Sequence, residues 1–451
     1  PDYEPIEISS LCNAGADFLA EEHPELGPQA FRGLPFLVGN KAGSGNCYIS
    51  RSGNESSLSI PIGKTANRVI FAHRLIETQQ HLNGPVDTEV AHYVFHFAGA
   101  ESITATIRDR YEISPVGDRR GIPRLAVGYP FLAVPDRADT THEQYEGRFD
   151  QAGKRQTEVA SPMIAPKWYY LWVWANPNPN EVIRSIEIIP KGPRFIIAGL
   201  TLSHIDEHPF SRKGRRPVKI TLKNPETANK PWDTHVNIDR GESTYAFPLP
   251  ATSTDEFLDA PAGFGEEQNS KSSPAYVELS GIDSGNVDVR QGQDTLAEVN
   301  WGKLQEQGAV ENDKVRIEVV DPGKNWVRVR VVDDETGQPV PCKIHFRSPD
   351  GVPYQPHGHH NQVNSNQDTW HIDVGGDVRL GQITYAYIDG TCQGWLPRGD
   401  VIVDVARGYE YDPIRTKITL EPGQQDIELR IKRWINMNDR GWYSGDSHVH
   451  F

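Results

Sequence analysis

Long hydrophobic runs are missing from this sequence of 451 residues. The densest apolar run, Trp168 to Trp174, is far shorter than the roughly 20 residues that a membrane-spanning helix needs. Positive charge is also in deficit, since 46 Lys and Arg stand against 61 Asp and Glu and leave a formal net charge of −15. An acidic chain is repelled by nucleic-acid phosphates and by anionic lipid surfaces. We therefore expect no membrane insertion and no nucleic-acid partner.

Cysteine is scarce as well, and its four positions exclude two common uses. No Cys-x-x-Cys pair occurs, which argues against zinc fingers and thioredoxin-like redox sites. The cysteines divide into Cys12 with Cys47 and Cys342 with Cys392, one pair in each of two predicted β-rich regions. We predict that each pair forms a disulfide worth roughly 3–4 kcal/mol on the chain-entropy model, which requires an oxidising compartment. The alternative is four buried thiols.

The composition that remains predicts a mainly β protein. Hydrophobic residues make up only 37% of the chain, and 40 Gly and 34 Pro interrupt it often. This balance is typical of turn-rich β-sandwiches rather than of helical bundles. We expect a helix content below roughly the 30% of average globular proteins. The length implies two to four domains.

Residues 1–205 predict a β-sandwich of the jelly-roll type. Short segments with alternating hydrophobicity recur between turns in this region. They are Ser57–Ile62, Arg68–Leu75, Ala91–Phe97, Ser102–Arg108, Trp168–Trp174, Val182–Ile189 and Phe195–Leu202. Trp168–Trp174 is apolar on both faces, so we interpret it as a central strand that is buried on both sides. The alternative, an aromatic platform for sugars, fits less well because the run has no polar face.

Residues 206–312 form a middle region with the weakest pattern. Thr252–Ser273 is rich in small and acidic residues, which predicts an exposed loop or linker. We expect one short helix within Gly302–Asn312. No function follows from this region.

Residues 313–433 predict a second β-sandwich. Val315–Val319 and Val327–Val331 alternate on either side of the turn-forming Asp321–Asn325, which predicts a hairpin. The later predicted strands are Ile383–Ile388, Val401–Val405, Ile414–Leu420 and Ile427–Ile431.

One loop of this region carries His357, His359 and His360 within four residues. Imidazoles are good ligands for divalent metals, so these three residues are a second candidate metal site. No carboxylate or thiol stands at tight spacing to them, and the alternative is a polar surface loop.

The leading candidate site lies at the end of the sequence, in Gly441–Phe451. If this segment is a strand, its period of two places Asp446, His448 and His450 on one face. Two imidazoles and a carboxylate suit a divalent metal; the alternative is a solvated tail. One strand supplies at most three poorly spread ligands. We therefore expect this chain by itself to bind metal weakly or not at all.

The segment Gly441–His450 resembles the first metal motif of the PHP (polymerase and histidinol phosphatase) superfamily, and more narrowly of the CehA/McbA carbaryl-hydrolase-like metallohydrolases. Several segments of this chain are also similar to the residues that precede the catalytic barrel in such proteins. These segments are Tyr354–His359, Asp373–Asp377, Tyr385–Gly390, Leu396–Gly399 and Ala406–Tyr411. The usual motif has Leu where Ser447 stands, a departure that alters no ligand.

This resemblance implies that residues 434–451 are a linker and the first strand of a PHP (β/α) barrel whose other strands and ligands are absent here. It implies a Zn, Mn or Fe ion in the complete protein and hydrolysis of an ester, amide or phosphoester by metal-activated water. A small-molecule or carbohydrate-related substrate is compatible with this chemistry. The oligomeric state is left open.

Two weaker resemblances concern the flanking regions. Phe31–Phe36 and Phe71–His73 resemble galactose-binding-like sandwiches that accompany secreted hydrolases. Val331–Pro341 resembles the entry to a carboxypeptidase-regulatory-like, or prealbumin-type, β-domain.

The leading prediction is therefore the amino-terminal accessory portion of an exported, bacterial-type hydrolase, periplasmic or extracellular, that does not catalyse by itself. Two alternatives stay open. One is a secreted glycan-binding β-sandwich whose jelly roll holds the sugar. The other is a structural or assembly protein whose sheet edges pair between chains.

Overall fold

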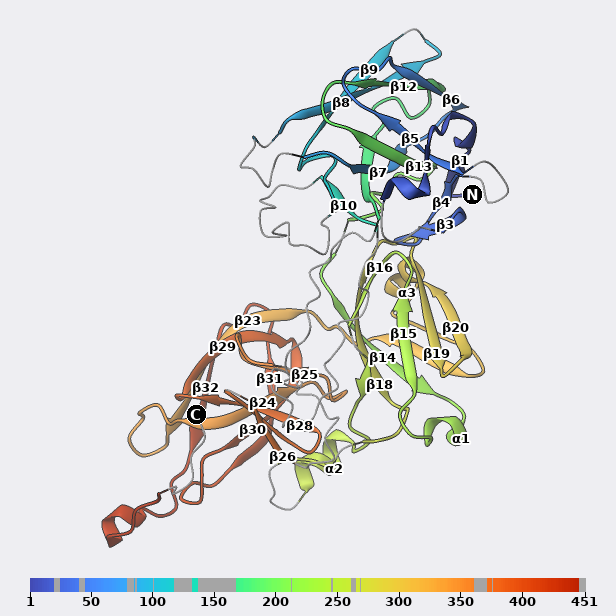
Figure 1. The fold of residues 1–451 in the computed structure, drawn as a ribbon. Coiled ribbons are helices and arrows are strands. Elements are labelled where there is room, and N and C mark those ends of the chain that lie inside the picture. The colour runs from blue at the N-terminus through green and yellow to red at the C-terminus, as the bar shows by residue number, and fades with distance from the viewer. Residues whose placement is uncertain are drawn as a thin grey trace.

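The computed structural model describes residues 1–19, 25–39, 45–78, 85, 87–99, 101–116, 132–136, 168–211, 213–244, 246–260, 265–267, 269–360, 371–374 and 376–445. Strands account for 53% of the structure and helices for 8%, which confirms the predicted mainly β class. The described sheets pack into three consecutive units (Figure 1). In the described part of the chain, no helix is both long and apolar enough to span a membrane.

The first unit packs a seven-stranded sheet on a four-stranded sheet. The larger sheet has the order β10-β11-β7-β13-β5-β2 with β1 beside β13, and the smaller has the order β6-β12-β8-β9. Its strands are β1 (Tyr3–Ile6), β2 (Ala14–Gly15), β3 (Gly27–Phe31), β4 (Leu34–Val38), β5 (Asn46–Arg51), β6 (Leu58–Lys64), β7 (Arg68–Leu75), β8 (Glu89–Phe97), β9 (Ser102–Arg108), β10 (Ala133–Pro135), β11 (Tyr170–Ala175), β12 (Ile183–Pro190) and β13 (Phe195–Ser203).

Aromatic side chains fill the core between these two sheets. The rings of Phe95 and Trp174 stack across it, and Phe71 lies 5.6 Å from Trp172 between ring centroids. On the opposite face of the larger sheet, the β3–β4 hairpin covers β13 with apolar side chains, so that all nine residues of β13 are buried. The prediction that the Trp168–Trp174 segment packs in the core is confirmed, although β13 and not β11 is the strand buried throughout.

The middle unit is a sandwich that the sequence pattern did not predict. A six-stranded sheet of order β16-β18-β14-β22-β21, with β17 beside β18, packs on a sheet of order β15-β19-β20. The elements are β14 (Arg216–Leu222), α1 (Pro225–Ala228), β15 (Thr234–Ile238), β16 (Gly241–Ser243), β17 (Phe247–Pro248), α2 (Thr254–Asp259), β18 (Ala275–Gly281), β19 (Asn286–Gln291), β20 (Asp294–Asn300), α3 (Trp301–Gln307), β21 (Ala309–Glu311) and β22 (Val315–Val319).

The predicted short helix is confirmed as α3. Asn300 caps it, because its side-chain oxygen accepts a hydrogen bond from the Lys303 backbone N–H at 2.9 Å. Gly308 ends it in the left-handed conformation at φ 73°. Trp301 and Leu304 project from α3 into the core.

The predicted hairpin between Val315–Val319 and Val327–Val331 is wrong. β22 pairs with β14 and β21 in the middle unit, whereas β23 (Lys324–Asp333) pairs with β29 and β32 in the third unit. Both segments alternate correctly, but Asp321–Asn325 carries the chain from one unit to the next. Alternation fixes which side chains face a core and does not fix which strand is the neighbour.

The third unit packs a sheet of order β29-β23-β32 on a seven-stranded sheet of order β26-β27-β28-β24-β30-β31, with β25 beside β24. The remaining elements are β24 (Cys342–Arg347), β25 (Pro353–Tyr354), β26 (His371–Val374), β27 (Asp377–Leu380), β28 (Ile383–Ile388), β29 (Thr391–Pro397), β30 (Gly399–Ala406), β31 (Ile414–Leu420), β32 (Asp426–Ile431) and the 3-10 helix η5 (Met437–Arg440). The valines of β23 and the aliphatic residues of β32 face the core between the two sheets.

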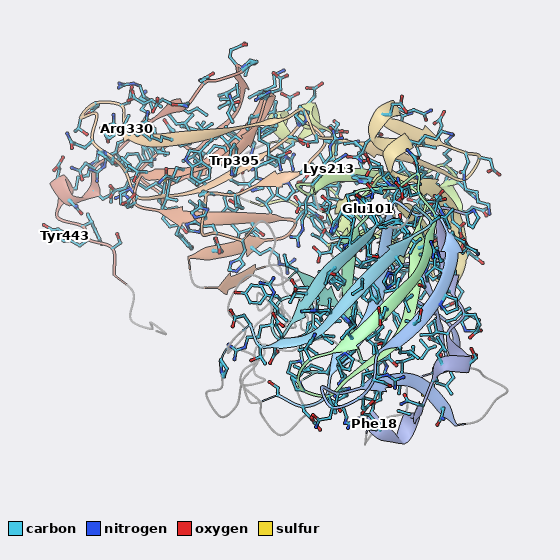
Figure 2. The ribbon with its side chains drawn as sticks, turned by 90° about the horizontal axis from the view of Figure 1, so that it is seen from above. Phe18, Glu101, Lys213, Arg330, Trp395 and Tyr443 are labelled. Atoms are coloured by element: carbon cyan, nitrogen blue, oxygen red, sulfur yellow. The ribbon has the colours of Figure 1, made fainter. Side chains whose placement is uncertain are left out.

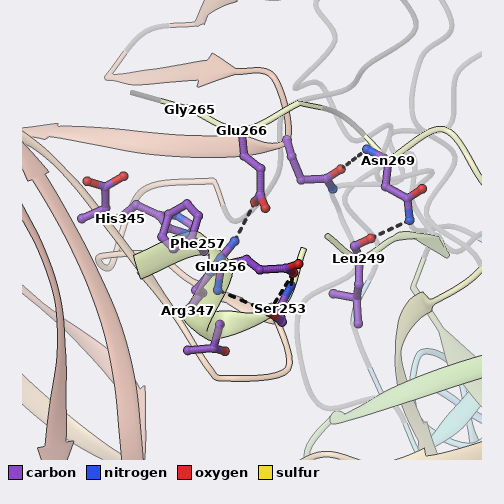
Figure 3. Close-up of polar contacts among 12 residues, drawn as sticks. Leu249, Ser253, Glu256, Phe257, Gly265, Glu266, Asn269, His345 and Arg347 are labelled. Carbon is purple, nitrogen blue, oxygen red and sulfur yellow. Dashed lines mark hydrogen bonds and ion pairs between the residues drawn. The ribbon is translucent and has the colours of Figure 1, made fainter. Parts of the chain in front are cut away.

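The segment between β17 and β18 is not the exposed loop that its composition predicts. We call the described residues 249–260, 265–267 and 269 the strap, because they lie across the outer face of the seven-stranded sheet (Figure 3). Ser253 and Glu256 form a reciprocal capping box that starts α2, and Phe257 on α2 is 2% exposed. Asn269 also ties the strap to the sheet, since its backbone N–H donates to the side-chain oxygen of Gln382 at 2.7 Å. The face of the sheet beneath the strap carries charged side chains, among them Arg347 and Asp404. A strap with polar residues can therefore pair with this face.

A buried ion pair holds the strap. The Arg347 guanidinium on β24 donates to Glu266 at 2.7 Å and stacks over the Phe257 ring at 3.6 Å (Figure 3). Both charged side chains are less than 10% exposed. Arg415 on β31 lies over the same ring at 4.1 Å.

Replacing Arg347 with Ala is expected to lower the free energy of unfolding by roughly 3–5 kcal/mol, because Glu266 is left buried without its partner. The matched control is Lys223→Ala, which breaks an exposed ion pair to Glu311 worth about 0–1 kcal/mol. Chemical unfolding followed by circular dichroism measures both. Equal losses from the two variants would contradict a structural role for the clamp.

Candidate functional site

The leading candidate metal ligands, Asp446, His448 and His450, lie outside the described residues. The structure describes the segment that leads to them, which leaves the third unit after β32. A salt bridge between Arg433 and Glu410 anchors its start, and the Trp434 indole N–H donates to the Tyr409 carbonyl at 2.8 Å. Beyond η5 the chain is exposed as far as Gly445.

Large aromatic side chains are exposed along this segment. Trp434 is 59% exposed, Trp442 68% and Tyr443 78%, and Tyr409 in the neighbouring turn is 96% exposed. Figures 1 and 2 show η5 and Tyr443 extending away from the body of the third unit. Contiguous exposed apolar patches mark interaction sites, whereas apolar residues scattered singly over a surface do not.

The second candidate site, the His357–His360 loop, is split by its glycine. Gly358 has φ 87°, in the left-handed region that a glycine adopts without strain. His357 packs edge-on against Trp326, with 5.6 Å between ring centroids. His359 and His360 instead contact the buried carboxylate of Asp377 at the start of β27.

Asp377 joins the two imidazoles. His359 Nδ1 donates to one carboxylate oxygen at 2.8 Å, and His360 Nδ1 donates to the other at 2.6 Å. The His360 backbone N–H adds a third hydrogen bond at 3.2 Å. The side chain of Asp377 is therefore paired on both oxygens.

The electrostatics of this cluster follow from the shared carboxylate. The hydrogen bond to Asp377 raises the pKa of His360 above its ordinary value. Burial by itself raises the pKa of Asp377, but the hydrogen bonds from His360 and His359 outweigh it and leave that pKa lowered. The cluster therefore favours a charged carboxylate beside a charged imidazole.

Both carboxylate oxygens of Asp377 already accept hydrogen bonds from the two Nδ1 atoms. Asp377 is therefore placed like a carboxylate that orients metal-bound histidines, and not like a metal ligand itself. Over the described ranges, no group of three or more His, Cys, Asp and Glu side chains is arranged to hold a metal ion. Sequence reasoning missed Asp377, since it follows His360 by 17 residues and reaches the loop only because β27 pairs beside β28.

A second set of ionisable side chains is fully enclosed beneath the strap. The His345 Nδ1–H donates to the Thr384 carbonyl at 2.8 Å, and burial, with Arg347 nearby, lowers the pKa of His345 to about 3. Asp404 accepts from the Tyr385 hydroxyl at 2.5 Å and from Arg415 at 2.9 Å. Each group is committed to a partner in the fold, so this set holds the strap and the sheet together.

The predicted disulfides are not formed in the structure, where all four cysteines are thiols. The Cys12 thiol contacts the Ile8 carbonyl at 3.5 Å. Burial is the main reason that the pKa of Cys12 and that of Cys342 are raised to about 12. The nearby Cys47 and Cys392 raise these two pKa values further. Cys12 and Cys47, like Cys342 and Cys392, are therefore near enough to influence each other electrostatically, without the bond that the sequence predicts.

Comparisons with known proteins add little to this geometry. No protein-family model matches the chain, and no curated protein matches it. Among solved structures, it is similar to the TIE protein of Bacillus anthracis at a TM-score of 0.16 and 10% identity, over 49% of this chain and 34% of that protein. The chain thus spans about a third of the length of that protein.

Replacing Asp377 with Asn is expected to destabilise the third unit in a pH-dependent way. The raised pKa of His360 stabilises the fold below its unfolded value and loses that contribution as the pH rises through the folded value. The lowered pKa of Asp377 stabilises the fold above its unfolded value and loses that contribution as the pH falls. The loss should therefore be largest between about pH 4 and 6.5.

We expect a loss of about 1.5–3 kcal/mol in that window and a smaller loss above it. Thermal unfolding from acid to alkaline pH measures the difference between the two proteins. His235→Ala is the control, because His235 is an exposed histidine in the middle unit, paired only with exposed Asp233. A difference that does not change with pH would argue against the charged pair.

Proposed function

We propose that this chain is the amino-terminal, non-catalytic portion of an exported metal-dependent hydrolase, and that its β-units carry a catalytic domain rather than perform chemistry. The observation that carries the proposal is the exposed aromatic segment at Trp434–Tyr443. It leads into Asp446, His448 and His450, the candidate ligands of the motif. A further domain that packs on the segment would remove these rings from water.

The free energy gained by burying these aromatic side chains supports an interface at the Trp434–Tyr443 segment. Burying a large aromatic side chain contributes about 1.5–3 kcal/mol, and three of the four rings, Trp434, Trp442 and Tyr443, lie within ten residues of one another. The anchor between Arg433 and Glu410 holds the start of the segment in place. A docked domain would therefore meet a surface whose base is already ordered.

The donor set of the adjoining motif fits a divalent metal. Neutral imidazoles of His448 and His450 and the carboxylate of Asp446 are ligand types that Zn, Mn and Fe accept. Such an ion, when bound, supplies an activated water for hydrolysis of an ester, amide or phosphoester. Within this chain, these three residues would contribute ligands from one side only, and others would have to complete the site.

The finer fold assignments belong to the same proposal. We assign the first unit to the galactose-binding-like sandwiches and the third to the carboxypeptidase-regulatory-like, or prealbumin-type, domains. Two antiparallel sheets around an aromatic core support the first assignment. A small mixed sheet packed on a larger antiparallel sheet supports the second. An exported location, periplasmic or extracellular, follows from such a hydrolase.

The metal prediction is tested by calorimetric titration of Zn²⁺ and Mn²⁺. We expect weak or no binding by the 451-residue chain and tight binding by a chain that continues into the rest of the barrel. His448→Ala and His450→Ala should abolish binding and hydrolysis in the longer protein, whereas His235→Ala should change neither. Tight stoichiometric binding by the short chain that survives loss of His448 and His450 would move the site to His357–His360 and end this assignment.

The docking surface is tested separately by acrylamide quenching of tryptophan fluorescence. In the 451-residue chain, Trp442 should be strongly quenched, because it is 68% exposed. The Trp442→Phe variant isolates its share of the signal from that of the other tryptophans. In the longer protein that share should be protected. An equally quenched Trp442 in both proteins would show that the segment is not an interface.

A further inference from the structure

The outer face of the β29-β23-β32 sheet carries an unusual set of side chains. Along β23, Val327, Val329 and Val331 point into the core, so Trp326, Arg328 and Arg330 point outward. The same alternation leaves Thr391, Gln393 and Trp395 outward on β29 and Asp426 and Glu428 outward on β32. Figure 2 looks onto the side of the unit that carries Arg330 and Trp395.

The strand register aligns these side chains in rows across the sheet. Trp326 is opposite Trp395 at one end. Arg328 is opposite Gln393 on one side and Asp426 on the other, and Arg330 is likewise between Thr391 and Glu428. An aromatic pair is thus followed by two polar rows.

The face is hollowed into a groove. A depression of about 930 Å³ runs over the two polar rows, and its walls include Tyr387 and His359. A smaller depression of about 250 Å³ continues over Trp326 and Trp395. His357 and Pro356 line both depressions, so the groove passes from the polar rows to the aromatic pair. Its combined size suits a ligand of several small rings.

The aromatic end is held open to solvent. Trp326 and Trp395 pack edge to face with 5.4 Å between ring centroids, and His357 braces Trp326 from the other side. The Trp326 indole N–H donates to the Gln393 side chain at 3.2 Å, which fixes its orientation. Trp395 is 55% exposed. The exposed Trp395 indole, packed against the fixed Trp326 ring, offers a large flat apolar surface.

The charges of the two polar rows cancel in pairs, and Asp389 in the wall of the groove adds one negative charge. Arg328 contacts Asp426 at 2.9 Å and Arg330 contacts Glu428 at 3.6 Å, and all four side chains are more than 40% exposed. Exposed pairs contribute only about 0–1 kcal/mol to stability, so the fold gains little from their alignment. A neutral row of alternating donors and acceptors does not attract phosphates or polyanions, and it is too polar for an amphipathic helix.

We propose that this groove binds a neutral saccharide. A pyranose ring has an apolar face of C–H groups that stacks on an indole, and an edge of neighbouring hydroxyls that both donate and accept hydrogen bonds. Trp395 provides the stacking surface. Arg328, Gln393 and Asp426 provide adjacent donors and acceptors for a second sugar along the chain. This site is on the third unit, and it does not depend on the proposed hydrolase.

The proposal is tested with the 451-residue protein by affinity electrophoresis through gels that contain xylan, galactomannan, mixed-linkage β-glucan or dextran, with polygalacturonate as the anionic comparison. We expect retardation by at least one neutral polysaccharide. Trp395→Ala should weaken binding about tenfold or more, as for the loss of a central aromatic contact, and Gln393→Ala should weaken it less. Trp395→Phe should retain part of the affinity.

Two controls separate binding from folding. Tyr409→Ala removes another highly exposed aromatic residue, outside the groove, and should leave retardation unchanged. The thermal unfolding of Trp395→Ala should match that of the unaltered protein, since the side chain is largely in water.

Several outcomes would overturn the assignment. They are no retardation by any neutral gel, retardation that survives Trp395→Ala, and retardation by polygalacturonate alone. In a longer chain, protection of Trp395 from acrylamide without added sugar would show that the protein itself covers this face, and it would also reject the saccharide site.

Discussion

The contact on which the arrangement of the middle and third units depends is the buried Arg347 guanidinium. It lies between the Glu266 carboxylate and the Phe257 ring, beneath a strap that begins and ends on strands of the middle sheet. Removing two charges from water costs several kcal/mol for each ion. That cost is offset only while the strap stays in place, because the strap supplies both the opposite charge and the ring. The ion pair thus links the middle unit to the larger sheet of the third, together with the apolar contacts of Leu249 and Tyr276 in the core of the third unit.

The strap held by this contact covers one surface of the third unit and leaves another exposed to solvent. The larger sheet buries one face in the core and covers much of the other with the strap. Among the described residues, none of the strap lies on the outer face of the small β29-β23-β32 sheet, whose outward side chains are the exposed tryptophan and the aligned polar rows. In the described part of this unit, the groove and the aromatic carboxyl-terminal segment are both exposed. They lie on different elements and have different proposed partners. The groove is proposed to bind a saccharide, and the segment is proposed to contact a further domain.

The histidine loop connects two environments within a few residues. Because Gly358 takes a left-handed conformation, His357 turns to the tryptophan end of the groove while His359 and His360 turn to Asp377. The Asp377 cluster fixes the loop, and the loop forms a wall of the groove. The histidine-rich loop thus makes two kinds of contact in the structure, one electrostatic and one of packing.

The sequence by itself determined the β class, the core-facing side of each alternating strand and the short helix α3, because these depend on local period and capping. It could not decide that Val315–Val319 and Val327–Val331 belong to different sheets, or that a polar strap covers a charged face. Nor could it bring Asp377 to His360, or align Trp326 with Trp395. Each of these depends on strand neighbours distant in the chain, and alternation alone specifies a face without specifying a partner. Only the tertiary structure made those choices.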